Sequence, residues 1–125
     1  MCTIAVVDDD LRVLESLQNL LASCGYKAVT YSSADMFLGS SELSQADCII
    51  ADVGMRQISG LELLQRVRAS QSEVPVVIIT GRPSANSKAF YLDNGADGFF
   101  RKPIDGQALV DLIDDLLTRP IKPTS

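Results

Sequence analysis

The sequence predicts an α/β fold in which five short parallel strands alternate with five helices. Short apolar or β-branched runs recur along the chain, and segments with apolar residues at helical spacing separate them. The chain has 125 residues, 46% of them hydrophobic, which suits one buried core but not two. We therefore expect a single domain with helices on both faces of the sheet, joined by right-handed crossovers.

The first two strand–helix units occupy the N-terminal third of the chain. The first strand is expected at residues 4–7 and stops at three consecutive aspartates. A helix follows, which Gly25 ends. Its apolar face is expected to consist of Leu14, Leu17, Leu21 and Cys24. Residues 27–31 are β-branched and aromatic enough for a second strand, and Ser33 can cap a short helix over 33–38.

The third and fourth units follow the same alternation. Residues 48–51 predict a strand that ends at Asp52, and residues 74–80 predict the most apolar strand, as expected where both faces are covered. The helix between them has an apolar face of Leu61, Leu64 and Val67. Ser84 is expected to cap the fourth helix. That helix carries Ala85, Ala89 and Leu92 on one face.

The fifth unit completes the domain. Asn94 and Gly95 close the fourth helix, residues 98–101 predict a short strand, and Asp105 is expected to cap the last helix. That helix is expected to be buried through Leu109, Leu112, Ile113 and Leu116. Residues 1–118 are therefore expected to form the domain, and residues 119–125, with two prolines, a tail or the start of a linker.

Charge and composition exclude several classes of function. The net charge is −5, from 16 acidic and 11 basic residues, which disfavours direct binding of nucleic acid. No apolar run is long enough to cross a bilayer, and the N-terminus has neither the basic region nor the cleavage site of a secretory signal. We therefore expect a cytoplasmic protein that does not bind membranes.

Cysteine and histidine usage narrows the chemistry further. Cys2, Cys24 and Cys48 lack CxxC spacing, and the chain contains no His. A zinc site and catalysis that depends on an imidazole of this chain are therefore excluded. We expect the cysteines to act as small apolar side chains.

Polar side chains follow four of the five expected strands. Asp8 and Asp9 follow the first, Asp52 the third, Thr80 the fourth and Lys102 the fifth. The carboxyl ends of parallel strands share one edge of the sheet, which is where ligands bind in open α/β folds. Three clustered carboxylates repel one another unless a cation intervenes, so this edge is expected to bind a hard divalent ion, for which Mg²⁺ is the best candidate.

Each of these residues also has a simpler structural interpretation. Asp9 or Asp10 could serve only as the N-cap of the first helix. Thr80 could be an ordinary strand residue, and Lys102 a solvated charge. The convergence of residues distant in sequence on one edge favours the functional interpretation.

Five segments carry a family resemblance, which extends over residues 3–118. They are VVDDD at 6–10, DVGM at 52–55, GLEL at 60–63, VVIITG at 76–81 and GADGFFRKP at 95–103. In order and spacing they resemble the receiver domain of two-component response regulators. The segment GFFRKPIDGQAL is especially similar to receivers of the subgroup often fused to a helix-turn-helix output domain.

The resemblance implies a flavodoxin-like (βα)5 fold with strand order 2-1-3-4-5. It implies that Asp52 accepts a phosphoryl group from a sensor histidine kinase or phosphotransfer protein. Mg²⁺ would be the cofactor, with Asp9 as a direct ligand, Asp8 acting largely through water, and the backbone carbonyl of Gly54 as a further ligand. The chain would then be a kinase substrate with at most slow autodephosphorylation of its own.

The resemblance also implies the residues of a switch. Thr80 would move to hydrogen-bond the phosphoryl group, Lys102 would pair with its oxygens, and Phe99 would be the switch aromatic. The Lys102–Pro103 bond would be cis. The face formed by the fourth helix, fifth strand and fifth helix would dimerise or contact an output.

The sequence departs from the family at several positions near the site. Arg56 stands where the family usually has proline, and Gly54 provides no side chain over the phosphoryl group. We expect Met55, Arg56 and Arg82 to modulate the phosphoryl lifetime. Phe99 lacks the hydroxyl of the commoner tyrosine, so its switching would depend on burial alone.

Two alternative functions stay open at this point. An aspartyl-phosphate hydrolase is disfavoured because Asp52-Val53-Gly54 lacks a second Asp two residues after the first. A phosphorylation-independent interaction module would retain the acidic pocket without using it.

Overall fold

The strands form one parallel sheet with the predicted topology. The computed structural model describes residues 2–40, 45–54, 58–70, 72–81 and 88–118. The sheet order is β2-β1-β3-β4-β5. The strands are β1 (Thr3–Val7), β2 (Lys27–Tyr31), β3 (Cys48–Asp52), β4 (Val76–Thr80) and β5 (Gly98–Arg101). The predicted α/β class and strand order are thus confirmed.

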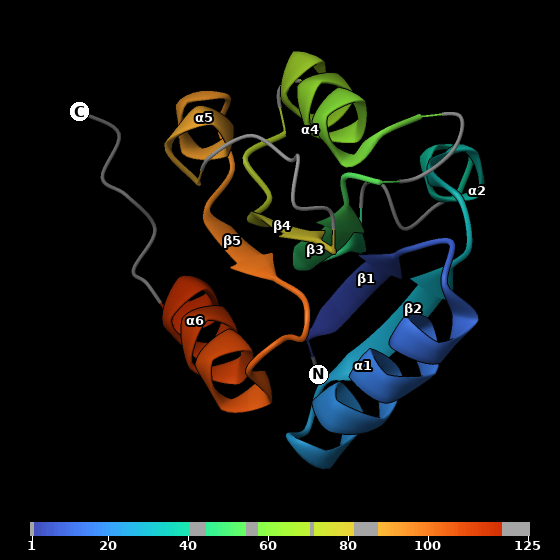
Figure 1. Cartoon of the computed structure of the whole chain (residues 1–125), viewed down its shortest axis with the longest axis vertical. Helices are drawn as coiled ribbons and strands as arrows, with labels where there is room; N and C mark the ends of the chain where they lie inside the picture. The colour runs from blue at the N-terminus through green and yellow to red at the C-terminus, as the bar shows by residue number, and fades with distance from the viewer. Residues whose placement is uncertain (1, 41–44, 55–57, 71, 82–87, 119–125) are drawn as a thin grey trace.

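Helices cover both faces of this sheet. They are α1 (Leu11–Ser23), α2 (Ala34–Leu38), α4 (Gly60–Ala69), α5 (Lys88–Asp93) and α6 (Gly106–Thr118). In Figure 1, α1 and α6 lie on one side of the sheet and α2, α4 and α5 on the other. The predicted fourth and fifth helices therefore correspond to α5 and α6. None of the helices in the described ranges has the length and hydrophobicity that a membrane crossing requires.

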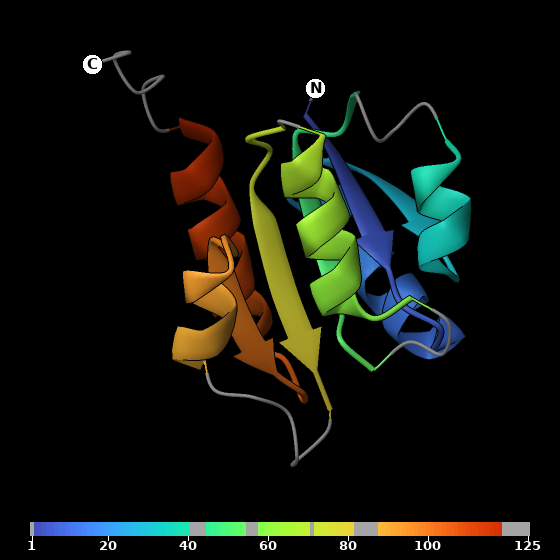
Figure 2. The ribbon, with the colours of Figure 1, turned by 90° about the horizontal axis from the view of Figure 1, so that it is seen from above.

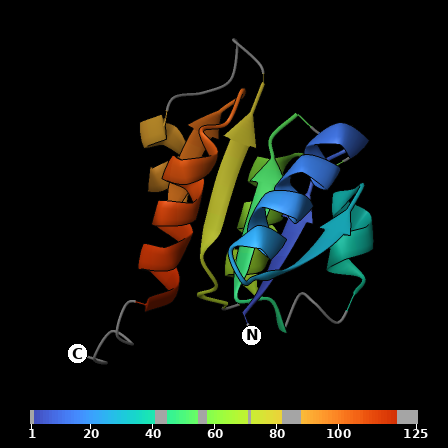
Figure 3. The same cartoon turned by 90° about the horizontal axis from the view of Figure 1, so that it is seen from below.

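The expectation of one buried core is wrong, because side chains alternate along each strand and each face of the sheet therefore has its own apolar core. Figures 2 and 3 show the helices running along the sheet. The core beneath α1 and α6 includes Leu14, Leu17, Leu21, Leu109, Ile113 and Leu116. The core beneath α2, α4 and α5 includes Phe37, Leu63, Leu64, Val67 and Tyr91. Every residue of β3 and β4 is buried, which explains why these two strands are the most uniformly apolar.

Caps explain where most of the helices begin and end. Asp10 and Ser33 accept hydrogen bonds from the first-turn amides of α1 and α2, and Asp105 does the same for α6. Gly25 and Gly95 have positive φ just after α1 and α5, where glycine is favoured. Ser84 and Ala85, the expected beginning of the fourth helix, lie outside the described residues.

Three expectations about the elements need correction. The fourth strand begins at Val76 and not at residue 74, because Pro75 has no amide hydrogen and the carbonyl of Val74 accepts a hydrogen bond from Arg68 instead. Leu112 is only partly buried. Cys24 is the exposed C-cap of α1 and does not belong to its buried face, because the helix ends there.

The other two cysteines differ in their surroundings. Cys48 is buried within β3, where desolvation raises the pKa of its thiol to about 12. It therefore behaves as the predicted small apolar side chain. Cys2 is partly buried before β1.

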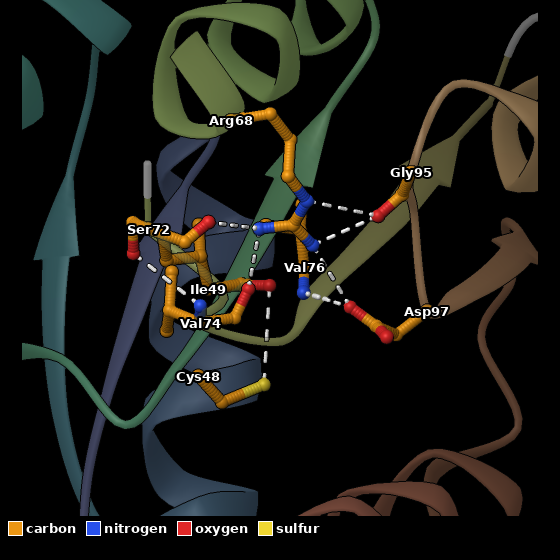
Figure 4. Close-up of polar contacts among 8 residues, drawn as sticks. All are labelled: Cys48, Ile49, Arg68, Ser72, Val74, Val76, Gly95 and Asp97. Carbon is orange, nitrogen blue, oxygen red and sulfur yellow. Dashed lines mark hydrogen bonds and ion pairs between the residues drawn. The ribbon is translucent and has the colours of Figure 1, made fainter. Parts of the chain in front are cut away.

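Arg68, near the end of α4, anchors the edge of the sheet opposite the carboxyl ends (Figure 4). Its guanidinium donates to the carbonyls of Gly95, Ser72 and Val74 at 2.8–3.2 Å. It also donates to Asp97 at 3.1 Å, and the same carboxylate oxygen accepts from the amide of Val76 at 2.9 Å. One planar side chain thus connects α4 to the segments that lead into β4 and β5.

Candidate functional site

The strand order brings the predicted site residues to one edge of the sheet. Strands β1, β3 and β4 are neighbours, so Asp8, Asp52 and Thr80 follow or end adjacent strands. Lys102 follows β5, and its backbone amide donates to the carbonyl of Thr80 at 2.7 Å. The edge is therefore built from four strands whose ends are held in register by backbone hydrogen bonds.

Three carboxylates gather at this edge. Oxygen atoms of Asp8, Asp9 and Asp52 all lie within 4.8 Å of one another. Asp8 is fully buried and Asp52 is 5% exposed, whereas Asp9 faces solvent. An all-oxygen set with one solvent-facing member fits Mg²⁺, which keeps several of its waters when it binds carboxylates.

Lys102 provides the positive charge of the site. Its Nζ lies 2.9 Å from Oδ2 of Asp8 and 3.7 Å from Oδ2 of Asp52. The Lys102–Pro103 peptide bond is cis. The ammonium thus bridges two carboxylates and forms its short hydrogen bond to Asp8.

The pKa values of Asp52 and Lys102 are both raised in this site. Burial, together with the negative charge of Asp8, raises the pKa of Asp52, although a backbone hydrogen bond from Gly54 and the charge of Lys102 oppose this. Burial alone would lower the pKa of Lys102, but its hydrogen bond to Asp8 and the charge of Asp52 outweigh that effect and raise it. Among the described residues of this edge, the carboxylates of Asp8, Asp9 and Asp52 therefore carry more negative charge than the Lys102 ammonium neutralises.

Asp10 and Asp9 have different roles. Asp10 is the N-cap of α1, and its carboxylate accepts from the amide of Arg12 at 3.0 Å. The backbone hydrogen bond of Arg12 holds the pKa of Asp10 below its usual value. The amide of Asp10 donates to Oδ1 of Asp8 at 2.9 Å, so the cap also orients the buried carboxylate. Asp9 is not needed as a cap and contributes its carboxylate to the cluster.

The remaining predicted residues divide between the site and its surroundings. Thr80 is 1% exposed at the end of β4, and Gly54 is partly buried two residues after Asp52. Phe99 lies away from the carboxylates, on the sheet face that α5 covers, and its ring stacks on Tyr91. Met55, Arg56 and Arg82 lie outside the described residues.

The role of Gly60, the first residue of α4, was not predicted from the sequence. A Cβ at this position would lie 2.7 Å from the carbonyl oxygen of Asp52 and 3.0 Å from Cα of Val53. Only glycine therefore allows α4 to pack directly against the backbone that carries Asp52. A glycine at the first position of a helix, directly after the N-cap Ser59, was the available signal.

Comparisons with known proteins find a matching family model and similar sequences. Residues 4–114 match the family model of the response regulator receiver domain. The transcriptional regulatory protein FixJ of Bradyrhizobium diazoefficiens is 32% identical over 114 residues, which cover 91% of this chain and 56% of FixJ. The response regulator protein TodT of Pseudomonas putida is 33% identical over 110 residues, which cover 88% of this chain and 48% of TodT.

A solved structure shows the same arrangement. A response regulator receiver domain protein from Clostridium thermocellum superimposes with a TM-score of 0.86 at 26% identity, covering 95% of this chain and 96% of its own. The chain spans about half the length of FixJ and TodT.

Proposed function

The chain belongs to the response regulator receiver domain family, and from that premise we propose that Asp52 accepts a phosphoryl group from a phosphohistidine of a sensor histidine kinase or phosphotransfer protein. The chain has no His, so the donor imidazole would lie outside the 125 residues of this sequence. The proposal makes this chain a kinase substrate with at most slow autodephosphorylation.

One observation carries the proposal. The ammonium of Lys102 lies between Asp8 and Asp52, 2.9 Å from the first and 3.7 Å from the second. Phosphoryl transfer depends on positioning and on neutralising the charge of the equatorial oxygens. A cation next to a nearly buried carboxylate, at the accessible edge of a parallel sheet, supports that chemistry better than it supports a purely structural ion pair.

The chemical step would proceed as follows. A carboxylate oxygen of Asp52 attacks phosphorus in line with the donor nitrogen, and an O–P bond forms as the P–N bond breaks. The electron pair of that bond stays on the imidazole nitrogen, which takes a proton from solvent. Lys102 pairs with the phosphoryl oxygens, and the amide of Asp10 keeps Asp8 oriented toward the site.

The donor set of Asp8, Asp9 and Asp52 would hold Mg²⁺, together with the backbone carbonyl of Gly54 that the family resemblance implies. When bound, Mg²⁺ would neutralise charge on the carboxylates and on the transferred group. Among the described residues, three carboxylates share this edge with the ammonium of Lys102, and a cation that relieves their mutual repulsion fits there, which supports this assignment.

The phosphoryl group would then act as the signal. It brings a charge of about −2 to the end of β3, and the Thr80 hydroxyl can gain a charge-assisted hydrogen bond of about 1.5–3 kcal/mol by moving toward it. Such an energy shifts an existing equilibrium and does not create a new fold. We expect Phe99 to take up the space that Thr80 leaves, which would alter the α5–β5–α6 face for a second copy or an output.

A groove beside the site supports docking of a protein donor. It has a volume of about 630 Å³ between α1 and the segment that leads into α6, with Asp10 and Lys102 at its site end. Its apolar part is formed by Val13, Leu17, Leu20 and Ile104. A partner that presents a phosphohistidine to Asp52 must contact the surface next to Lys102, and this groove is part of that surface.

The wider assignments follow from the same proposal. We place the receiver domain at residues 1–118 and a tail or linker at 119–125, in a cytoplasmic regulator that does not itself bind nucleic acid through this domain. Met55, Arg56 and Arg82 remain predicted modulators of the phosphoryl lifetime. Control of transcription would require an output domain such as the subgroup resemblance implies.

The test is incubation with acetyl phosphate and Mg²⁺, followed by intact-mass spectrometry. We expect one phosphoryl group per chain, lost when Asp52 is changed to Asn and absent when EDTA replaces Mg²⁺. Repeated turnover of a phosphate monoester without a stable adduct would instead favour the hydrolase. A folded protein that neither takes the label nor responds to beryllofluoride with Mg²⁺ would favour the phosphorylation-independent module.

A further inference from the structure

The ring of Phe99 lies between two partners. It stacks on Tyr91 with the ring centroids 5.3 Å apart and the planes 15° from parallel. The guanidinium carbon of Arg101 lies 5.3 Å from the centroid of the same ring. Tyr91 belongs to α5, whereas Phe99 and Arg101 lie two residues apart on β5, next to that helix (Figure 1).

Tyr91 is more deeply buried than Phe99, the ring on which it stacks. It is 4% exposed and belongs to the core between the sheet and α2, α4 and α5. The ring of Phe90 also contacts it edge-on, with centroids 5.2 Å apart and planes at 88°. Phe99, in contrast, is only partly buried. A partly buried ring therefore lies against a buried one.

The strand register places this group next to the site. Ile78 pairs with Phe99 and Thr80 pairs with Arg101 across β4 and β5. Residues two apart on a strand point to the same face, so Thr80 lies on the face that carries Phe99, one step closer to the carboxyl edge. A shift of Phe99 toward Thr80 would change the present stack of its ring on Tyr91.

We propose that Tyr91 is a positioning residue that holds Phe99 in its partly buried position and so sets how readily the Asp52 site adopts its phosphorylated form. The inference rests on the proposed function. Phe99 has no hydroxyl, so ring contacts alone decide its position. If the rings stack in the unphosphorylated form and not in the phosphorylated form, the free energy of stacking shifts the equilibrium between these two forms by its full amount.

The experiment titrates the Mg²⁺-loaded protein with beryllofluoride, which mimics the phosphoryl group, and follows ring signals by fluorine NMR after incorporation of fluorophenylalanine. Tyr91→Leu is expected to bind beryllofluoride about 2- to 10-fold more tightly than the wild type, the factor that corresponds to aromatic stacking free energies. Tyr91→Phe keeps the stack and is expected to match the wild type. Leu92→Ala, at an exposed residue of the same helix, is the matched control and is expected to change the affinity little.

A double-mutant cycle separates this role from a merely structural one. In a Phe99→Leu background, Tyr91→Leu is expected to have no further effect on beryllofluoride affinity, because it acts only through the Phe99 ring. Equal gains in both backgrounds, or an unchanged affinity in folded Tyr91→Leu, would overturn the inference.

Arg101→Gln provides a second route should Tyr91→Leu fail to fold, because Arg101 is exposed. It removes the other partner of the ring and is expected to tighten binding about 2- to 5-fold; an unchanged affinity would overturn the inference. A wild-type protein that neither responds to beryllofluoride nor takes a label from acetyl phosphate would overturn the proposed function itself, and the inference with it.

Discussion

Gly60 lies so close to Asp52 that a Cβ on residue 60 would be 2.7 Å from the Asp52 carbonyl oxygen. The first turn of α4 is thereby pressed against the backbone that carries the proposed phosphoacceptor. The position of the Asp52 carboxylate thus depends on a residue that has no side chain and no charge.

We expect Gly60→Ala to displace this backbone. Because the nearest atoms are main-chain atoms that cannot rotate away, the substitution should lower the free energy of unfolding by about 1–3 kcal/mol and slow labelling by acetyl phosphate. Urea denaturation and intact-mass spectrometry measure the two effects. Gly39→Ala is the control, since its Cβ would lie 3.4 Å from the carbonyl oxygen of Asp35, at ordinary van der Waals distance. Equal effects at both glycines would contradict the steric explanation.

Asp52→Asn is expected to stabilise the metal-free protein. The folded-state pKa of Asp52 is raised, so the folded state retains its proton at pH values where the unfolded state has lost it. The free energy of unfolding therefore falls as pH rises from about 4, the ordinary carboxylate pKa, through the folded-state value. The stability advantage of Asp52→Asn should accordingly be absent at low pH and grow toward pH 7.

Paired denaturation curves in EDTA across this pH range test that prediction. Asp35→Asn is the matched control, at an exposed carboxylate in the first turn of α2. Because Asp35 lies outside the carboxylate cluster, Asp35→Asn should not reproduce the gain expected of Asp52→Asn. A wild-type protein that is more stable than Asp52→Asn at neutral pH would contradict the assignment of surplus negative charge to the site.

Lys102→Met is expected to destabilise the metal-free protein by about 3 kcal/mol, because it leaves the fully buried carboxylate of Asp8 without its counter-charge. Mg²⁺ should restore more stability to this variant than to the wild type, although labelling of Asp52 stays slow. For the wild type, Mg²⁺ at 100 times its Kd is expected to raise the free energy of unfolding by about 2.7 kcal/mol. Thermal melts with EDTA and with Mg²⁺ measure the loss of stability in Lys102→Met and its recovery on addition of Mg²⁺. Lys88→Met, at an exposed residue of α5, is the control. If Mg²⁺ leaves the melting temperature of both proteins unchanged, the proposed metal site is wrong.

Arg68→Lys is expected to destabilise the protein by about 2–4 kcal/mol with its charge retained. A lysine ammonium cannot reach the carbonyls of Gly95, Ser72 and Val74 as well as Asp97 from one position, so partly buried acceptors lose their donors. Arg66→Lys is the matched control in the same helix, where Arg66 forms an exposed pair with Glu62. Comparable losses in chemical denaturation at the two positions would contradict the anchoring role of Arg68.

The alternation of two residue periods was sufficient to predict the α/β class of the fold. Residues 48–51 and 76–79 are uniformly apolar because both faces of the sheet are covered there, and the helical spacing of Leu14, Leu17 and Leu21 follows from one buried face. Strand ends were equally informative, since topology alone brings Asp8 and Asp52 to one edge. The ends of elements were predicted least well. At Val74, for example, the carbonyl accepts a hydrogen bond from the Arg68 side chain, and β4 begins only at Val76.

The sequence by itself determined the class of fold, the strand order through a family resemblance, and the set of polar residues that share the carboxyl edge. These depend on local periodicity and on the order of elements along the chain. Only the tertiary structure decided that Asp10 is the cap and not Asp9, that Lys102 forms its short bond to Asp8, and that Tyr91 stacks on Phe99. Such choices depend on how helices pack against the sheet, which joins side chains far apart in sequence at distances that no local pattern encodes.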